Sequence, residues 1–134
     1  MNYPRVSVAG IAVEGLKIFI ARRNPGGDLG GKWEFPGGKT EKGETDEAAL
    51  VREFEEEFGV TVTPGPLLGT ASFEHKGAAY VLHAYRVYFT GEKFTPHEHS
   101  EWHWAGMEEI ESLDFAGSDR LLFPVLKAYL QGQT

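Results

Sequence analysis

The sequence predicts a single α/β domain whose β-sheet lies between helices. Residues 79–90 carry apolar side chains in both alternating sets, which is typical of a strand covered on both faces. Residues 46–58 repeat apolar side chains with the period of an amphipathic helix. The chain has 134 residues, of which 41% are hydrophobic, including three Trp, five Tyr and nine Phe. This supports one substantial core and leaves no room for a second domain, so we expect residues 1–134 to form one unit.

The N-terminal part of the chain is predicted to be a β-hairpin. Two apolar stretches, 5–13 and 16–23, are separated by a tight turn at residues 14–15. Small side chains occupy one face of the first strand, which indicates either close packing or room for a ligand on the sheet; they are Val6, Val8, Gly10 and Ala12. Residues 24–31 contain four glycines and predict a flexible flap.

A short strand and a glycine turn are predicted before the helix. Residues 32–35 form the strand, and the glycines of the turn 36–38 allow it to aim backbone carbonyls or amides at a metal or a phosphate. Thr45 is suited to cap the N-terminus of a helix over 46–58, and Gly59 to end that helix in the left-handed conformation.

The C-terminal half is predicted to contain three more strands and two helices. A connection at 63–69, with two prolines and two glycines, precedes strands at 68–75 and 79–90 that are joined at residues 76–77. A polar loop at 91–100 is followed by a strand at 101–104 and a helix at 107–113. A last helix lies within 118–131, and Pro124 is either near its first turn or bends it.

The composition excludes several classes of protein. There is no cysteine, so neither a disulfide framework nor a thiolate metal site is possible, and a reducing cytoplasm is the simplest location. No apolar run approaches ~18 residues, and the first five residues lack a basic region followed by an apolar core. We therefore expect no membrane span and no cleaved leader.

The charge distribution argues against binding of a nucleic-acid polymer and is compatible with a small, metal-bound nucleotide. The formal charge is −7, and residues 38–60 hold eight acidic and three basic residues, a net −5. Such a surface repels a polymer of phosphates. A small polyphosphate can still bind when divalent cations lie between it and the carboxylates.

Three glutamates of the predicted helix share one face. At about 100° per residue, Glu53, Glu56 and Glu57 fall within one narrow arc, beside an apolar stripe that the helix can bury. Converging carboxylates without thiols suit Mg²⁺ or Mn²⁺, and Arg52 lies one turn before Glu56, with which it can pair. The alternative is a solvated acidic helix face without a ligand.

The glutamates belong to a longer pattern, G-x5-E-x7-R-E-U-x-E-E-x-G-U, in which U is a bulky apolar residue. Every fixed position is matched, by Gly38, Glu44, Arg52, Glu53, Phe54, Glu56, Glu57, Gly59 and Val60. In this motif, over residues 38–60, the chain resembles the Nudix hydrolases. That resemblance implies an α/β/α sandwich with a mixed sheet over essentially the whole chain.

The resemblance also implies roles for individual residues. Glu53, Glu56 and Glu57 would bind the divalent ions with help from a backbone carbonyl of Gly37 or Gly38. Three other residues would assist: Arg52 would hold the carboxylates in place, Glu44 would be a secondary contributor, and Lys39 would reach the phosphates. A carboxylate that metal does not saturate can accept the proton of the attacking water. We favour Glu53 for this, with Glu98 as the alternative.

Residues outside the motif are also candidates. The loop before the last strand contains Glu98, where the family often supplies another acidic metal ligand or base, although a plain acidic loop residue is the alternative. The nearby histidines have the spacing of no zinc signature and are expected at the surface; they are His97, His99 and His103. Arg22 and Arg23, at the end of the second strand, are candidates to contact the phosphate or base of the substrate, and a solvated strand end is the alternative.

The flanking sequences KWEFPGGKTEKGET and EWHW...LDFAGSDR resemble the MutT branch and its cytidine-nucleotide relatives. This implies cleavage of a nucleoside triphosphate to monophosphate and pyrophosphate, with 8-oxo-dGTP as the first expectation. Aligning LDFAGSD on that branch places Asp119 where the base is read, whereas capping of the last helix is the alternative.

The sequence leaves other substrates and one non-enzymatic function possible. CTP or modified dCTP, ADP-ribose and dinucleoside polyphosphates are alternative substrates, and a nucleotide-sensing domain that does not cleave is the alternative outside enzymes. We expect a monomer or homodimer that acts on a small nucleotide, away from nucleic-acid polymers and membranes.

Overall fold

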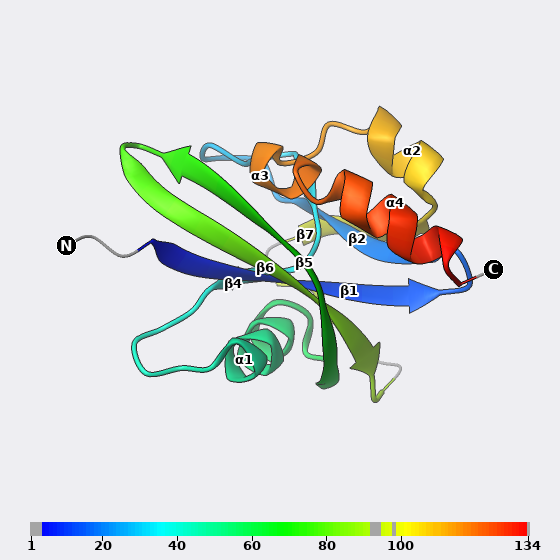
Figure 1. Cartoon of the computed structure of the whole chain (residues 1–134), viewed down its shortest axis with the longest axis horizontal. Helices are drawn as coiled ribbons and strands as arrows, with labels where there is room; N and C mark the ends of the chain where they lie inside the picture. Colours follow the sequence, from blue (N-terminus) through cyan, green and yellow to red (C-terminus); the bar gives the residue numbers. More distant parts are fainter. Residues whose placement is uncertain (1–3, 92–94, 98, 134) are drawn as a thin grey trace.

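The computed structural model describes residues 4–91, 95–97 and 99–133. Its centre is a seven-stranded mixed sheet with helices on both faces (Figure 1). The strands are β1 (Arg5–Glu14), β2 (Lys17–Arg23), β3 (Trp33–Glu34), β4 (Gly37–Lys39), β5 (Val62–His75), β6 (Ala78–Phe89) and β7 (His99–Ala105). The helices are α1 (Asp46–Phe58), α2 (Met107–Ser112), α3 (Gly117–Arg120) and α4 (Phe123–Gln131). The predicted α/β/α sandwich with a mixed sheet is confirmed.

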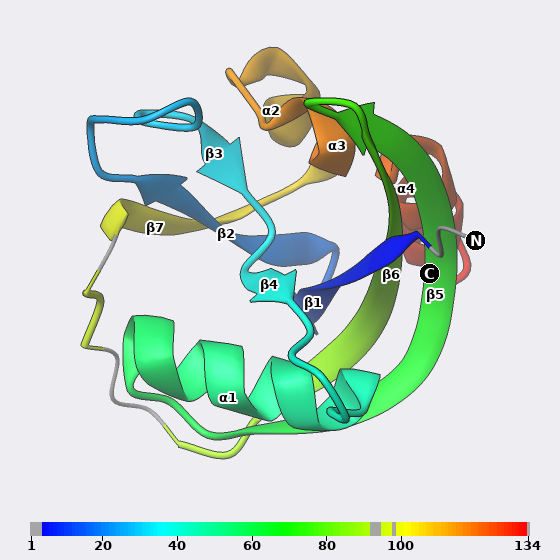
Figure 2. The same ribbon diagram turned by 90° about the vertical axis from the view of Figure 1, so that its left-hand side faces the viewer.

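The sheet is ordered β3-β2-β1-β6-β5, with β4 paired to β1 and β7 paired to β2. The pairing of β1 with β6 is parallel and makes the sheet mixed, whereas the other pairs are antiparallel. Helix α1 covers one face and α2, α3 and α4 cover the other, as Figures 1 and 2 show. Each face therefore buries its own hydrophobic cluster, one containing Phe54 and the other containing Phe35.

Close packing explains the small residues of β1. A methyl group on Gly10 would lie 2.3 Å from a ring carbon of Phe54, so the helix side chain fills the space above this glycine. Room for a ligand, the other interpretation of this face, does not apply at Gly10. The close approach lets α1 lie directly on the central strand.

Helix α1 has the predicted ends. The Thr45 side chain accepts a hydrogen bond from the backbone N–H of Ala48, and Gly59 adopts the left-handed conformation with φ of 62°. The amide of Gly59 donates back to the last helical turn. Both ends are set by local side chains, which fixes where the acidic face begins.

Three predicted elements need correction. The stretch 63–69 is part of β5 rather than a connection. Its prolines are tolerated because β5 lies at the edge of the sheet, where a proline can be placed without loss of a ladder hydrogen bond. The register of β5 also shifts at Pro64–Leu67 and Leu67–Gly69. The turn 36–38 overlaps the short strand β4, which pairs with β1. The last helix is divided into α3 and α4, with Pro124 in the first turn of α4.

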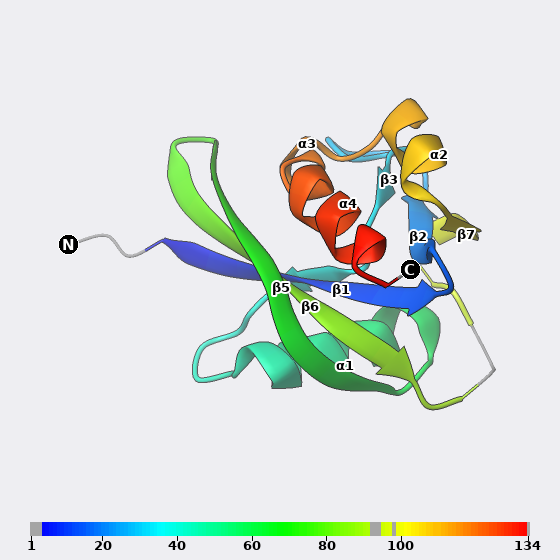
Figure 3. The ribbon, with the colours of Figure 1, turned by 45° about the vertical axis from the view of Figure 1, so that its right-hand side comes forward.

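The β5–β6 hairpin extends beyond the body of the sheet (Figure 3). Its two-residue loop consists of Lys76 and Gly77, both with positive φ, and joins the paired residues His75 and Ala78. This conformation suits the right-handed twist of a tight hairpin.

The described part of the chain contains no helix long and apolar enough to cross a membrane.

Candidate active site

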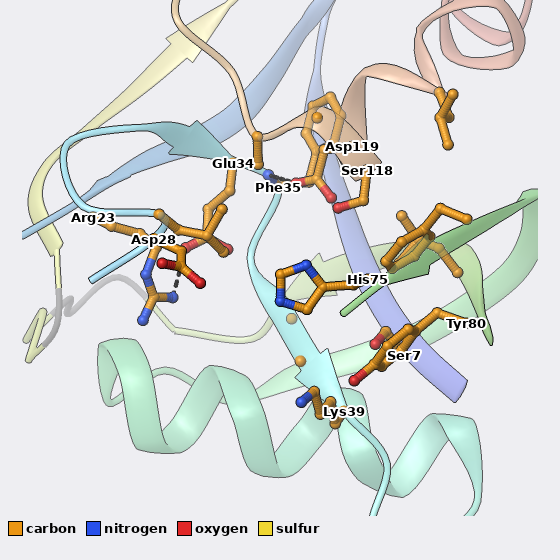
Figure 4. A pocket seen from close by; sticks show the side chains of 18 of the residues that line it. Ser7, Arg23, Asp28, Glu34, Phe35, Lys39, His75, Tyr80, Ser118 and Asp119 are labelled. Atoms are coloured by element: carbon orange, nitrogen blue, oxygen red, sulfur yellow. Dashed lines mark hydrogen bonds and ion pairs between the residues drawn. The ribbon is translucent and has the colours of Figure 1, made fainter. Parts of the chain in front are cut away.

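A pocket of about 750 Å³ lies between the sheet, the β5–β6 hairpin, α3 and the glycine-rich loop after β2 (Figure 4). Lys39 and the glycines of β4 line one end, above α1, and Asp119 lines the other. Its size suits a nucleotide-sized ligand. Three predicted substrate contacts, Arg23, Lys39 and Asp119, all line this one pocket.

The acidic side chains of α1 differ in depth. Glu56 is 60% exposed, whereas the Glu53 side chain is 15% exposed and Glu57 is buried at 5%. The three glutamates share one face of the helix, as predicted, but Glu57 is withdrawn from solvent, and the amide of His97, from the segment before β7, donates to its backbone carbonyl. The acidic face of α1 is therefore partly buried.

Arg52 holds these carboxylates at fixed positions. Its Nε and Nη2 lie 2.7 and 2.9 Å from the two oxygens of Glu44, and its Nη1 lies 2.9 Å from Glu53 Oε1. The predicted pair with Glu56 is present at 3.3 Å. The Arg52 hydrogen bonds lower the Glu44 pKa to about 2, and the same contact raises the Arg52 pKa, so both groups stay charged.

Backbone packing brings the glycines of β4 against Glu53. A methyl group on Gly38 would lie 2.6 Å from Glu53 Oε1, and one on Gly37 would lie 1.9 Å from the carbonyl oxygen of Val8. Only glycine fits at Gly37, where the neighbour is backbone, whereas a side chain at Gly38 would push the Glu53 carboxylate aside. The Glu53 carboxylate thus lies beside the backbone of β4, at the Lys39 end of the pocket.

The donor set of this region fits a hard divalent cation, since it consists of carboxylate oxygens and neighbouring backbone carbonyls without sulfur. Within residues 4–91, 95–97 and 99–133, no three acidic or histidine side chains are already gathered into a metal cage.

Asp119 is buried at the opposite end of the pocket. Its Oδ2 accepts a hydrogen bond of 2.9 Å from the Phe35 amide, so the carboxyl group joins α3 to β3 and does not cap the last helix. Burial, followed by the nearby charge of Glu34, raises the Asp119 pKa to about 8. At neutral pH the group is largely protonated and offers one donor and one acceptor.

The carboxylate beside Asp119 was not a predicted site residue. Glu34 is buried, lines the pocket, and its Oε1 lies 2.9 Å from Arg23 Nη1 and 3.0 Å from His99 Nε2. A charged residue between Trp33 and Phe35 in a short strand is the only signal that the sequence offers for it.

The comparisons with known proteins agree with this geometry. A model of the NUDIX domain matches residues 1–126. The chain belongs to the Nudix family. It is 36% identical over 123 residues to the CTP pyrophosphohydrolase of Escherichia coli (strain K12), which covers 92% of this chain and 89% of that protein. It is 34% identical over 100 residues to the 8-oxo-dGTP diphosphatase of Haemophilus influenzae, which covers 74% of this chain and 73% of that protein.

A solved structure extends the likeness to the fold. The solution structure of the E. coli ORF135 protein superposes with a TM-score of 0.83 at 34% identity, over 99% of this chain and 93% of that chain. The protein is therefore a Nudix hydrolase that acts on nucleoside phosphoanhydride bonds, and divalent metals are generally used by the family.

The remaining predicted residues of this Nudix chain fall in different places. Arg22 is exposed and pairs with Glu101 at 3.1 Å, which fits the solvated strand end, whereas Arg23 lines the pocket. The prediction of surface histidines holds for His97 and His103 and is wrong for His99, whose side chain is fully buried. The predicted base or metal ligand Glu98 lies outside the described residues.

Proposed function

We propose that residues 1–134 form one Nudix domain that hydrolyses nucleoside triphosphates to a monophosphate and pyrophosphate. The observation that carries this proposal is the arrangement of the pocket, which runs from the Glu53–Gly38 contact at one end to the buried Asp119 at the other. A nucleotide whose base lies beside Asp119 extends its phosphates toward Lys39 and the acidic helix.

The carboxylates of α1 are proposed to bind Mg²⁺ or Mn²⁺, namely Glu53, Glu56 and Glu57, with a backbone carbonyl of Gly37 or Gly38. Such ions neutralise charge on phosphoryl oxygens and lower the pKa of a bound water. The chain's own part is then to orient the phosphates through Lys39 and to accept a proton from water. We assign the proton acceptor to Glu53, with Glu98 as the alternative, while Glu44 orients Arg52.

The hydrogen-bonding capacity of Asp119 favours a particular base edge. A protonated carboxyl donates one hydrogen bond and accepts another. The oxidised guanine of 8-oxo-dGTP offers O6 as acceptor and N7–H as donor, and this pair complements the donor and acceptor of the protonated Asp119 carboxyl. Plain guanine presents N7 as a second acceptor, so the hydrogen bond from N7–H is lost and two acceptors face each other, at a cost of roughly 1–3 kcal/mol, or about ten- to hundredfold in kcat/KM. We therefore propose 8-oxo-dGTP as the preferred substrate.

A cytidine triphosphate is the second candidate. Cytosine presents N4–H as donor and N3 as acceptor, which is the same complementary pair, and the 36% identity to a CTP pyrophosphohydrolase supports it. The pocket chemistry fits both bases, so measurement must rank them.

The test is a substrate panel with excess Mg²⁺, comprising 8-oxo-dGTP, dGTP, dCTP, 5-methyl-dCTP, CTP and ADP-ribose, with pyrophosphate and monophosphate quantified. We expect the largest kcat/KM for 8-oxo-dGTP, at least tenfold above dGTP, and no turnover in excess chelator. A higher value for a cytidine nucleotide selects the second candidate. Failure to release pyrophosphate from any triphosphate refutes the proposed function.

A further inference from the structure

His99 is buried in a place where an apolar residue would be expected. Its side chain has no exposed area, and its ring stacks on Phe58 with centroids 4.8 Å apart and an interplanar angle of 20°. A phenyl ring at this position would pack against Phe58 equally well. The imidazole instead adds a hydrogen bond, from Nε2 to Glu34 Oε1 at 3.0 Å.

The hydrogen bond assigns the tautomer of His99. Since the Glu34 carboxylate is an acceptor, Nε2 carries the hydrogen and donates it. The other ring nitrogen, Nδ1, is buried and has no hydrogen-bond partner in the described part of the chain. Among the described residues, the one hydrogen bond of the buried His99 ring is therefore its contact with Glu34.

Glu34 connects this contact to the pocket. Its Oε1 is held from two sides, by His99 Nε2 and by Arg23 Nη1, and the carboxylate lines the pocket next to Asp119. Two donors on one oxygen restrain the position of that oxygen and leave the second oxygen of Glu34 for other partners. Figure 4 shows Glu34 and Asp119 on neighbouring walls of the same pocket.

We propose that His99 is a positioning residue for recognition of the nucleotide base: through Nε2–H it fixes the Glu34 carboxylate beside Asp119, so that the two carboxyl groups present one rigid hydrogen-bonding edge. The inference rests on the proposed placement of the base beside Asp119. It gives His99 a part in base selection although the residue has no surface in the pocket.

The proposal separates binding of the base from binding of the sugar and phosphate. Without the Nε2–H donor, Arg23 is the one remaining hydrogen-bond donor to the Glu34 carboxylate among the described residues, and the base edge is less well fixed. Lys39 and the acidic helix lie at the other end of the pocket and are unaffected. Affinity for the base should fall while affinity for a sugar phosphate without a base stays constant.

Two substitutions distinguish the hydrogen bond from packing. The variant His99→Phe keeps a ring against Phe58 and removes the donor. The variant His99→Gln gives up the ring and carries an amide N–H close to the position of Nε2. As a matched control, His103→Phe makes the first change at an exposed histidine of the same strand, which pairs with Glu109.

The experiment measures, by calorimetry, the binding of the metal-free protein to 8-oxo-dGMP and to deoxyribose 5-phosphate. We expect His99→Phe to weaken the nucleotide at least tenfold and the sugar phosphate less than twofold. His99→Gln should recover the nucleotide to within about threefold of wild type, and His103→Phe should match wild type. In turnover, His99→Phe should raise KM and leave kcat within about twofold.

Three results would overturn the inference: unchanged nucleotide affinity in His99→Phe, an equal loss for both ligands, or a fall in kcat at constant KM. The last would mean that His99 acts through the neighbouring loop instead of through Glu34. The binding measurement also stands apart from hydrolysis. If the panel shows no triphosphate cleavage and the monophosphate of the candidate base still loses affinity in His99→Phe, the proposed reaction fails and the role of His99 remains.

Discussion

The carboxylate of Glu53 lies against the backbone of Gly38, so close that a methyl group on Gly38 would be 2.6 Å from Oε1 and 2.7 Å from the carboxyl carbon. Two parts of the motif, fifteen positions apart in the sequence, thus meet in space because β4 pairs with β1 on the side that α1 covers. The contact places the proposed proton acceptor at the end of the pocket.

Gly38→Ala is expected to displace Glu53 and to lower kcat/KM by about a hundredfold, since misplacement of a reacting group by about 1 Å has an effect of that size. The melting temperature should fall by only a few degrees, because β4 is short and lies beside the pocket. Gly91→Ala is the matched control, since its added methyl group meets no atom of the described residues within 4 Å. Equal activity of the two variants would contradict the contact.

Arg52→Lys tests the network around the acidic helix. The guanidinium binds Glu44 with two nitrogens and Glu53 with a third, and an ammonium group cannot reproduce that planar arrangement. We expect the Mg²⁺ concentration for half-maximal activity to rise about 10- to 100-fold. Glu41→Gln is the control, because Glu41 also lies 3.2 Å from Arg52 but is largely exposed, and it should change this value less than twofold.

Local signals explain what the sequence predicts well. Helix α1 begins after a Thr45 cap and ends at left-handed Gly59, and the β5–β6 hairpin turns at Lys76 and Gly77, because each boundary depends on residues within a few positions of it. The acidic motif is of the same kind, since its members share one helix. Such features depend little on the rest of the fold.

Features that depend on the whole fold are missed. The first half of β5 was predicted as a connection because its prolines are acceptable only at a sheet edge, and the edge is set by pairing with β6. Likewise, Glu34 and His99 lie 65 positions apart in the sequence and come together only in the fold, so the residues around each give no sign of their contact. Asp119 was found by alignment to relatives, whereas its burial and its contact with Phe35 follow only from packing.

An exposed ion pair joins Asp28 of the glycine-rich loop, which lines the pocket, to Lys76 in the turn of the β5–β6 hairpin, with Nζ and Oδ2 3.2 Å apart. Because exposed pairs are weak and screened by salt, Asp28→Asn should change KM by at most about threefold at low ionic strength and not at ~0.5 M salt. Lys76→Gln should do the same, and the double variant should add nothing.

Glu101→Gln provides the comparison, since it breaks a similarly exposed pair, with Arg22, on residues that do not line the pocket. It should leave KM unchanged at every salt concentration. Additive effects of the two single variants would show that Asp28 and Lys76 act on the substrate separately and not as a pair.

Asp119 should give the folded protein a characteristic dependence of stability on pH. Its pKa is raised from an ordinary 3.8 to about 8, first by burial and then by the charge of Glu34. Between these two values the folded state binds more protons than the unfolded state, so this residue makes the free energy of unfolding decrease as pH rises through the window. Above about pH 8 both states are ionised and the decrease stops.

Asp119→Asn removes that dependence while the amide oxygen still accepts the hydrogen bond of Phe35. In melting experiments on the metal-free protein, the melting temperature of the variant minus that of wild type should rise steadily from pH 4 to pH 8 and then stay level. Glu34→Gln, with Asp119 intact, should move the upper end of the window below pH 8, because one of the two causes of the shift is gone. A difference between variant and wild type that is constant over the whole range would mean that Asp119 is ionised in the folded protein, and the protonated base-reading carboxyl would have to be abandoned.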